Sequence, residues 1–258
     1  MTSRKNANKG AAVHNHKPTE LIVALDYPRP EPALGMVKAL GDLPIIYKVG
    51  SELFIAGGPD FVRELVHQKK RVFLDLKLHD IPNTVARAAA QIALLKVEMF
   101  TVHLSGGSAM VRAVADELAE ISELRPKILG VSVLTSFDDV RWAEVTKSLT
   151  GHAVDTLDSV EGLVEHAVAW GADGIVCSSL ELESLRKQYP TLYTVVPGIR
   201  PQGMTAHDQA RVMTPAQAHQ AGASAIVMGR PILEAKDARK LVESVLKELS
   251  PQAVSAYG

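Results

Sequence analysis

The chain has 258 residues, of which 47% are hydrophobic and 22% charged, a composition typical of a globular protein with one large or two small domains. The net charge of −1 argues against nucleic acid or an anionic membrane as the main partner, but it does not exclude a local phosphate site. Cys177 is the only cysteine, which excludes an intrachain disulfide and a cysteine metal cluster and favours a reducing compartment.

Residues 1–19 are rich in lysine, arginine and histidine and contain no apolar run. We therefore expect a flexible polar tail and neither a secretory signal nor an anchor. No later segment has the run of about 20 apolar residues that a membrane helix needs, so the sequence predicts a cytoplasmic protein. Residues 251–258 are expected to form a short C-terminal tail.

Short apolar runs rich in β-forming residues alternate with segments of helical periodicity from residue 20 to residue 250. The predicted strands are Leu21–Leu25, Ile45–Val49, Val72–Lys77, Met99–His103, Ile128–Leu134, Gly174–Cys177, Tyr193–Val196 and Ala225–Met228. The predicted helices are Pro32–Leu40, Pro59–Gln68, Asn83–Leu95, Ala109–Ile121, Glu161–Trp170, Leu180–Gln188, Pro215–Gln220 and Ala238–Leu249. Eight such units without a composition break predict a single-domain (β/α)8 TIM barrel, with a doubly wound open sheet as the alternative.

In a barrel of this kind, functional residues gather at the C-terminal ends of the strands. The sequence has the corresponding pattern, because polar residues stand at or just after the ends of most predicted strands. These residues are Asp26, Lys48, Asp75, Lys77, His103, Thr135, Arg200 and Arg230.

The third predicted strand carries charge inside an apolar run. Side chains two apart face the same side of a strand, so Phe73, Asp75 and Lys77 share one face and four aliphatic residues share the other. A carboxylate and an ammonium are costly to desolvate there unless they pair with each other or with a ligand. The pair is either a structural ion pair or part of a catalytic site.

Asp26, Lys48, Asp75, Lys77 and Asp80 together form an alternating set of anions and cations at one barrel mouth. Neighbouring carboxylates favour the charged form of a lysine, which makes Lys77 a proton donor and a poor amine nucleophile. The ammonium groups would also repel a divalent metal ion bound by these aspartates, so we expect no metal.

Glycine and arginine follow the last two predicted strands. Gly198 and Gly229 allow close approach to backbone N–H groups, and Arg200 and Arg230 add positive charge. The loops after the seventh and eighth strands of a barrel frequently bind phosphate, which is the ligand we expect here.

Over residues 20–249 these motifs resemble the orotidine 5′-phosphate decarboxylase family. The Asp-x-Lys-x-x-Asp core is shared with sugar-phosphate relatives, whereas the complete set in this order is specific. The motifs are Ala24-Leu25-Asp26, Tyr47-Lys48-Val49-Gly50, Asp75-Leu76-Lys77-Leu78-His79-Asp80-Ile81-Pro82-Asn83-Thr84, Thr101-Val102-His103 with Gly106-Gly107, Val133-Leu134-Thr135-Ser136, Val196-Pro197-Gly198-Ile199-Arg200, Asp208-Gln209 and Met228-Gly229-Arg230-Pro231-Ile232.

The resemblance implies decarboxylation of orotidine 5′-phosphate to uridine 5′-phosphate, the last step of pyrimidine nucleotide synthesis, without metal or cofactor. Lys77 would protonate C6 and stabilise the C6 carbanion. Asp75 would face the substrate carboxylate and hold Lys77 charged and aimed. Asp80 and Thr84 would reach across a homodimer interface into the partner's site.

The resemblance also implies the substrate contacts. Asp26 and Lys48 would hold ribose hydroxyls, with Lys48 completing the charge network, and Thr135 would read the pyrimidine. A loop at Pro201–Asp208 would close over the ligand and bring in Gln209. The residues implied to bind substrate are Asp26, Lys48, Thr84, Thr135, Pro197, Arg200, Gln209, Gly229 and Arg230.

Other residues with reactive or aromatic groups are expected to be structural. We assign His103 a structural role, Cys177 a place in the core, and Trp142 and Trp170 to helix packing. Arg200 could contact the ligand or brace its loop.

Two other functions compete with this decarboxylation. A magnesium-dependent sugar-phosphate decarboxylase or aldol-type lyase shares the charged core and would lose activity in a chelator. A catalytically silent barrel would bind nucleotide or protein without turnover, and the intact charge set argues against it.

Overall fold

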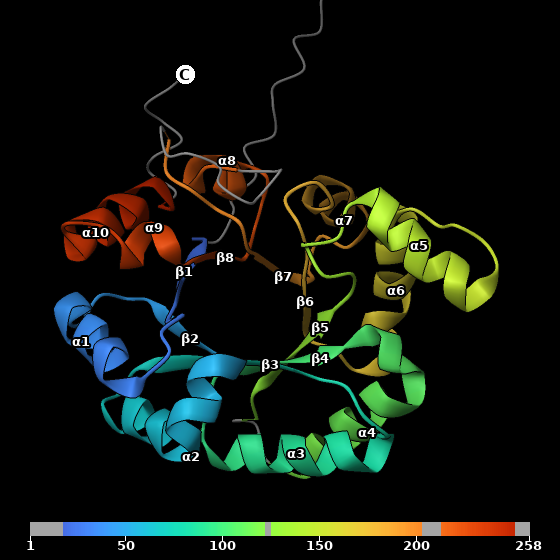
Figure 1. Cartoon of the computed structure of the whole chain (residues 1–258), viewed down its shortest axis with the longest axis horizontal. Coiled ribbons are helices and arrows are strands. Elements are labelled where there is room, and N and C mark those ends of the chain that lie inside the picture. The colour runs from blue at the N-terminus through green and yellow to red at the C-terminus, as the bar shows by residue number, and fades with distance from the viewer. Residues whose placement is uncertain (1–17, 122–124, 203–212, 251–258) are drawn as a thin grey trace, which may run out of the picture.

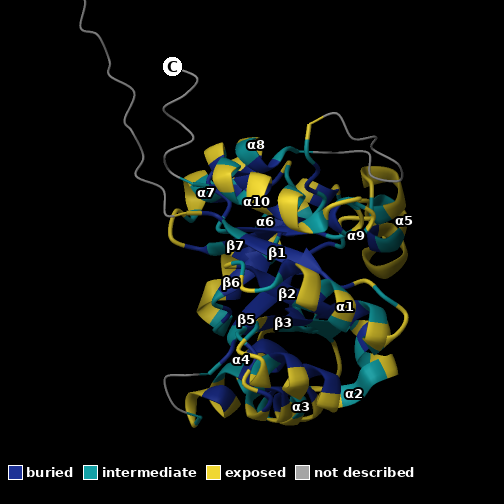
Figure 2. Cartoon of the chain, turned by 90° about the vertical axis from the view of Figure 1, so that its left-hand side faces the viewer, coloured by how far each residue is buried: buried dark blue, intermediate teal, exposed yellow. Residues whose placement is uncertain are grey.

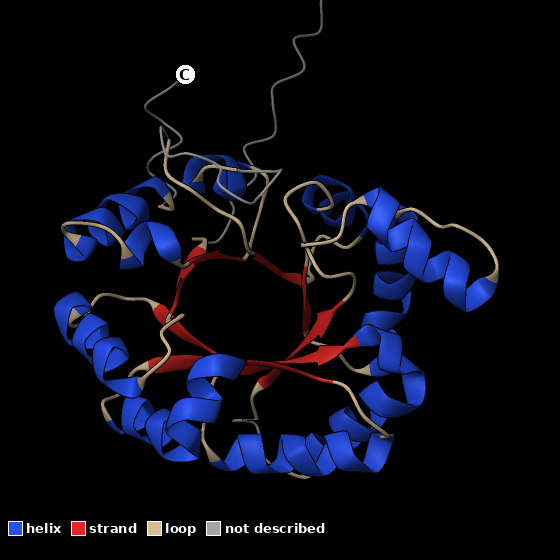
Figure 3. Cartoon of the chain, in the orientation of Figure 1, coloured by secondary structure: helices blue, strands red, loops and turns tan. Residues whose placement is uncertain are grey.

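The computed structural model describes residues 18–121, 125–202 and 213–250. Eight parallel strands close into a barrel that is ringed by helices (Figures 1 and 3), which confirms the predicted TIM barrel. The open sheet is wrong, because β1 pairs with β8. The strands are β1 Glu20–Ala24, β2 Ile46–Gly50, β3 Arg71–Leu78, β4 Met99–His103, β5 Lys127–Val131, β6 Gly174–Val176, β7 Tyr193–Val196 and β8 Ala225–Met228.

Helices cover the outer face of every part of the barrel wall in Figure 1. Across the described ranges, no helix is both long and apolar enough to cross a membrane. The helices are α1 Pro30–Leu40, α2 Ser51–His67, α3 Pro82–Leu94, the 3₁₀ turn η1 Leu104–Gly106, α4 Gly107–Ala119, α5 Asp139–Thr150, α6 Thr156–Trp170, α7 Leu182–Gln188, α8 Pro215–Gln220, α9 Arg230–Leu233 and α10 Ala238–Glu248.

Several elements differ from their predicted form: α6 begins five residues before the predicted Glu161, the short helix α9 was not predicted, and three further differences have a clear structural reason. Strand β5 ends at Val131 and not at Leu134, because its last partner on β4 is His103, where β4 also ends. Helix α2 begins eight residues before the predicted Pro59, since it contains a kink at Gly58 (φ +62°) that interrupts the helical period. Helix α5 was not predicted, and among its residues only Thr146 is buried, so it has no apolar stripe to detect.

The core has two layers. Most buried apolar side chains lie between the strands and the helices, and a second cluster fills the inside of the barrel. Figure 2 shows the buried strands at the centre and exposed residues on the outer surfaces of the helices. The inner cluster consists of Ile22, Ala24, Ile46, Phe73, Met99, Leu129, Val195, Ala225 and Val227.

Thr19 lies at the start of the packed chain. Its side-chain hydroxyl donates to the carbonyl of Ala223 (2.7 Å) and forms a hydrogen bond with Nδ1 of His219 (2.9 Å). The residue is 4% exposed. Thr19 therefore packs with the barrel, although it was predicted to be the last residue of the N-terminal tail.

Ion pairs join the N-terminal ends of the strands on the side away from the candidate site. Arg71 donates to both carboxylate oxygens of Glu98 (2.5 and 2.6 Å) and to Glu20 (2.6 Å), which also accepts from the hydroxyl of Tyr193 (2.7 Å). Burial acts to raise the pKa of Glu98, but hydrogen bonds and charge from Arg71 and Lys127 outweigh it and lower the pKa.

We expect Glu98→Gln to lower the free energy of unfolding at neutral pH by about 1 kcal/mol, because it removes the charge from a partly exposed network. Since the pKa of Glu98 is lowered on folding, its contribution is present above the ordinary value of 4.5 and is lost as the pH falls through the folded pKa. Urea unfolding should therefore show a difference between variant and wild type that shrinks in acid. Glu117→Gln, on an exposed position of α4, is the control, and a difference independent of pH would contradict the assignment.

Candidate active site

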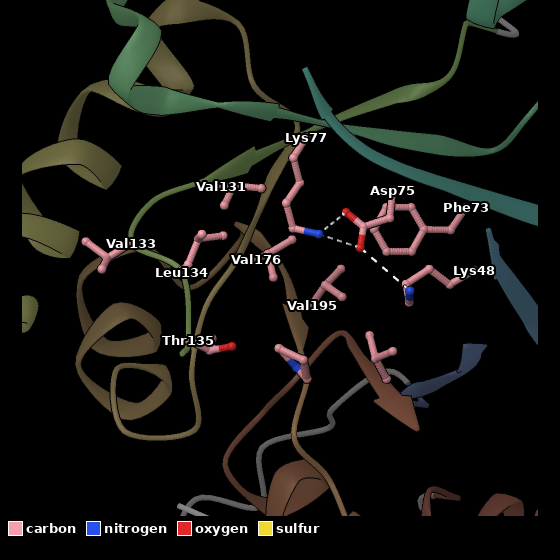
Figure 4. A pocket seen from close by; sticks show the side chains of 12 residues that line it. Lys48, Phe73, Asp75, Lys77, Val131, Val133, Leu134, Thr135, Val176 and Val195 are labelled. Atoms are coloured by element: carbon pink, nitrogen blue, oxygen red, sulfur yellow. Dashed lines mark hydrogen bonds and ion pairs between the residues drawn. The ribbon is translucent and has the colours of Figure 1, made fainter. Parts of the chain in front are cut away.

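A cavity of about 130 Å³ opens at the C-terminal ends of the strands (Figure 4). Its wall is mostly apolar, with three charged side chains on one side. A second, more polar pocket lies beside it and shares Lys48, Asp75 and Lys77, so the two form one site. The lining of the first is Lys48, Phe73, Asp75, Lys77, Val131, Val133, Leu134, Thr135, Val176, Val195, Pro197 and Val227.

Four of the predicted charged residues form a continuous chain of ion pairs. Nζ of Lys48 donates to Oδ1 of Asp26 (3.0 Å) and lies 3.8 Å from Oδ2 of Asp75. Nζ of Lys77 donates to both oxygens of Asp75, at 2.9 and 2.8 Å. Figure 4 shows the Lys77 ammonium and the Asp75 carboxylate directed at each other inside the cavity. The alternation of anions and cations is therefore present for four of the five predicted residues, all but Asp80.

The four charged side chains differ in their exposure to solvent. The side chains of Asp75 and Lys48 are 12% and 14% exposed, whereas those of Lys77 and Asp26 are 37% and 53% exposed. A buried carboxylate is tolerated only when its oxygens are hydrogen-bonded, and Asp75 accepts from Lys77 and from the hydroxyl of Thr101 (2.9 Å). The carboxylate thus fixes the ammonium at the edge of the cavity.

Strand β3 is irregular where it carries these charges. Lys77 has a φ of +52°, which is in the left-handed region that residues with a side chain seldom adopt. The register between β3 and β4 shifts between Leu74 and Leu78. Irregular strand geometry next to active sites commonly redirects a side chain, and here both Asp75 and Lys77 line the cavity.

Asp80 and Thr84 lie outside both pockets. Asp80 follows β3, its carboxylate accepts from the backbone N–H of Ile81 (2.6 Å), and Thr84 is in the first turn of α3. Both are exposed, and Ile81 between them is 66% exposed. The expectation that they complete a partner's site stays a prediction.

The ends of β7 and β8 bring the predicted phosphate-binding residues to the same mouth. Gly198 has a φ of +80°, which favours glycine, and a Cβ on Gly229 would lie 3.2 Å from Oδ2 of Asp26. Arg230 is exposed, whereas Arg200 is 6% exposed and its backbone N–H donates to the carbonyl of Met213 (3.0 Å). Gln209 and most of the predicted Pro201–Asp208 lid lie outside the described residues.

His103, Cys177 and the two tryptophans were predicted to have structural roles. The ring centroid of His103 lies 5.3 Å from that of His79. Burial lowers the pKa of His103, and the nearby His79 and Lys77 lower it further, whereas the charge of Asp75 acts in the opposite direction. Cys177 is fully buried, which raises its thiol pKa and agrees with a place in the core. Trp142 and Trp170 pack against the core from α5 and α6.

Two features of this site were not predicted from the sequence. Thr101 was noted as part of a motif but given no role, although its position two residues before His103 on β4 could have placed it on the inner face. The valines at 131, 176 and 195, called the apolar wall below, surround the Lys77 ammonium in Figure 4. These valines were not predicted because nothing in the sequence distinguishes them from the valines of the core.

Comparisons with known proteins agree on one family. The model of the family described as orotidine 5′-phosphate decarboxylase / HUMPS matches residues 19–245. The chain is 42% identical over 231 residues to orotidine 5′-phosphate decarboxylase of Pseudomonas putida strain GB-1, covering 90% of this chain and 97% of that protein. It is 45% identical over 231 residues to the same enzyme of Rhodopseudomonas palustris strain HaA2, covering 89% and 94%.

Among solved structures, the orotidine 5′-phosphate decarboxylase of Lactobacillus acidophilus aligns with a TM-score of 0.79 and 37% identity, covering 90% of this chain and 99% of that one. The orotidine 5′-phosphate decarboxylase of Thermotoga maritima aligns with a TM-score of 0.67 at 23% identity, covering 89% and 99%, and supports the barrel fold alone. Both sequence relatives and both solved structures are named orotidine 5′-phosphate decarboxylase.

Proposed function

Because the chain belongs to the orotidine 5′-phosphate decarboxylase family, and is a carboxy-lyase of UMP biosynthesis, we propose that Lys77 donates the proton that replaces the departing carboxylate. As the bond from C6 to the carboxylate breaks, its electron pair stays on C6 and carbon dioxide leaves. That pair lies in the plane of the pyrimidine, outside the π system, so a fixed nearby cation must stabilise it. The observation that supports this role is the ammonium held by Asp75 at the edge of the cavity.

Asp75 serves as the group that aims this ammonium. Its carboxylate binds Nζ through both oxygens and is itself largely buried, so the lysine head has one preferred position. Lys48, 3.8 Å away, extends the network toward Asp26. A preoriented cation needs no reorganisation when charge develops at C6, which is the main way that a site of this kind lowers a barrier.

The apolar wall has a complementary role. Val131, Val176 and Val195 form one side of the cavity and surround the end of Lys77. Electrostatic attraction between the ammonium and the C6 anion is stronger in such a low-dielectric setting than in water. The wall also offers an apolar space for carbon dioxide, which is nonpolar.

The rest of the substrate would extend across the barrel mouth. Asp26 and Lys48 line the polar pocket and would bind ribose hydroxyls, while Thr135 lines the main cavity and would contact the pyrimidine. Gly229, next to Asp26, and Arg230 would bind the phosphate together with Gln209. Pro197 lines the cavity, and the burial of Arg200 favours the role of bracing its loop.

We further propose that the enzyme is a cytoplasmic homodimer whose sites are shared. Asp80 and Thr84 are exposed beside the exposed Ile81, and they lie outside the pockets of their own chain. An isologous interface at this surface would bring them to the partner's cavity, so that Asp80 adds a second carboxylate near Lys77.

Turnover is expected to persist unchanged in EDTA, because the proposed mechanism uses Lys77 and requires neither metal nor cofactor. Within the described residues, no three histidine, cysteine, aspartate or glutamate side chains are arranged to hold a metal ion. The measurement is the loss of the orotate chromophore of orotidine 5′-phosphate, with and without EDTA. Chelator-sensitive turnover restored by magnesium would contradict the proposal, and keto-sugar phosphates are the control substrates for the metal-dependent relatives.

A further inference from the structure

Thr101 connects the two central groups of the site. It lies in the middle of β4, is 0% exposed, and shares the inner face of the barrel with Met99. Its hydroxyl donates to Oδ1 of Asp75 (2.9 Å) and accepts from the backbone N–H of Lys77 (2.9 Å). A hydroxyl has one proton to donate, and here that proton and one of the two acceptor positions of the oxygen are used within the site.

The pairing of β3 with β4 shows why this hydroxyl is needed. Leu74 pairs with Phe100 and Leu78 pairs with Val102, so three residues of β3, 75 to 77, stand opposite the single residue Thr101. The excess residues interrupt the regular ladder at this point, and the backbone N–H of Lys77 donates to the Thr101 hydroxyl (2.9 Å). The Thr101 side chain supplies the acceptor at the point where Lys77 adopts its φ of +52°.

We infer that Thr101 is a positioning residue of the decarboxylation: it fixes the carboxylate of Asp75 and the left-handed backbone of Lys77 relative to each other. The inference rests on the proposed role of Lys77 as the acid. The ammonium reaches its place through a flexible side chain that is anchored at both ends, by the Lys77 backbone and by Asp75. Thr101 holds both anchors.

Loss of the hydroxyl should therefore affect the rate of chemistry more than substrate binding. Ribose, pyrimidine and phosphate contacts come from other residues, so KM should change little. Without this hydroxyl, Nζ of Lys77 would occupy a wider range of positions, and a displacement of about 1 Å can lower the rate about 100-fold. A merely structural hydroxyl would instead lower thermal stability and leave the kcat of the folded enzyme unchanged.

The test compares Thr101→Val, which keeps the shape and removes the hydroxyl, with Thr101→Ser, which keeps the hydroxyl. We expect kcat of Thr101→Val to fall about 10- to 100-fold with KM within about 3-fold of wild type, and Thr101→Ser to stay within about 3-fold in both. Thr101→Ala gives the same comparison if the valine variant fails to fold, as judged by thermal unfolding.

Thr194→Val is the matched control. Thr194 is also a 0% exposed threonine on a barrel strand, and its hydroxyl accepts from the backbone N–H of Ser224 (3.1 Å), away from the cavity. Its kcat should stay near that of wild type. A Thr101→Val or Thr101→Ala enzyme with wild-type kcat, or a serine variant as slow as the valine variant, would overturn the inference.

Lys77→Ala separates this inference from the proposed function. If Lys77→Ala is inactive and Thr101→Val has wild-type kcat, only the role of Thr101 is wrong. If Lys77→Ala retains turnover, the proposed acid is wrong, and the role of Thr101 falls with it.

Discussion

Lys77→Ala is expected to reduce kcat by at least about 10⁴-fold, because the variant loses both the general acid and the cation that stabilises the C6 anion. The loss of the orotate chromophore measures decarboxylation directly. Binding of uridine 5′-phosphate should be retained, since the groups proposed to hold ribose and phosphate are unchanged. This pairing of lost turnover with retained binding is what a residue acting on the reacting carbon should show.

Lys96→Ala is the matched control for this prediction. Lys96 is an exposed lysine that follows α3, and its φ of +57° is close to the +52° of Lys77. Both substitutions remove a lysine side chain from a left-handed backbone position, so a general effect of that change would appear in both. We expect wild-type kcat for Lys96→Ala. A Lys77→Ala enzyme that keeps more than about a tenth of wild-type kcat would contradict the assignment of the acid.

Asp80→Asn is expected to lower kcat by about 10³-fold, although Asp80 does not line the cavity of its own chain. The reason is the proposed shared site, in which this carboxylate acts in the partner subunit. Coexpression of Lys77→Ala with Asp80→Asn should then restore activity to about a quarter of wild type, because half of the dimers are mixed and each mixed dimer has one intact site.

A second coexpression provides the control for shared sites. Lys77 and Asp75 lie in the same chain and are joined by hydrogen bonds of 2.8 and 2.9 Å. Mixed dimers of Lys77→Ala with Asp75→Asn contain a defect in both sites, so they should restore nothing. Absence of restoration in the Asp80→Asn mixture, with mixed dimers verified by differently tagged subunits, would show that Asp80 acts within its own chain or not at all.

Much of the site could be predicted from local pattern. A strand presents alternate residues to one face, so the spacing of Asp75 and Lys77 predicted that they share a face, and both line the cavity. The parallel strands of a barrel end at one mouth, so Asp26 and Lys48 could be expected near that pair. The distances of 3.0 Å and 3.8 Å from Lys48 to the two aspartates agree with this reasoning.

Other features depended on contacts between residues far apart in the sequence. The left-handed φ of Lys77 and the two hydrogen bonds of Thr101 arise from the mismatch of β3 against β4, and register between strands is not encoded in either strand alone. The approach of Gly229 to Asp26 requires β8 to close against β1. Residue order and periodicity thus determined the fold and the charged residues at the mouth of the barrel. Only tertiary packing decided how these charges are held, because the hydrogen bonds that hold them form between strands that the barrel brings together.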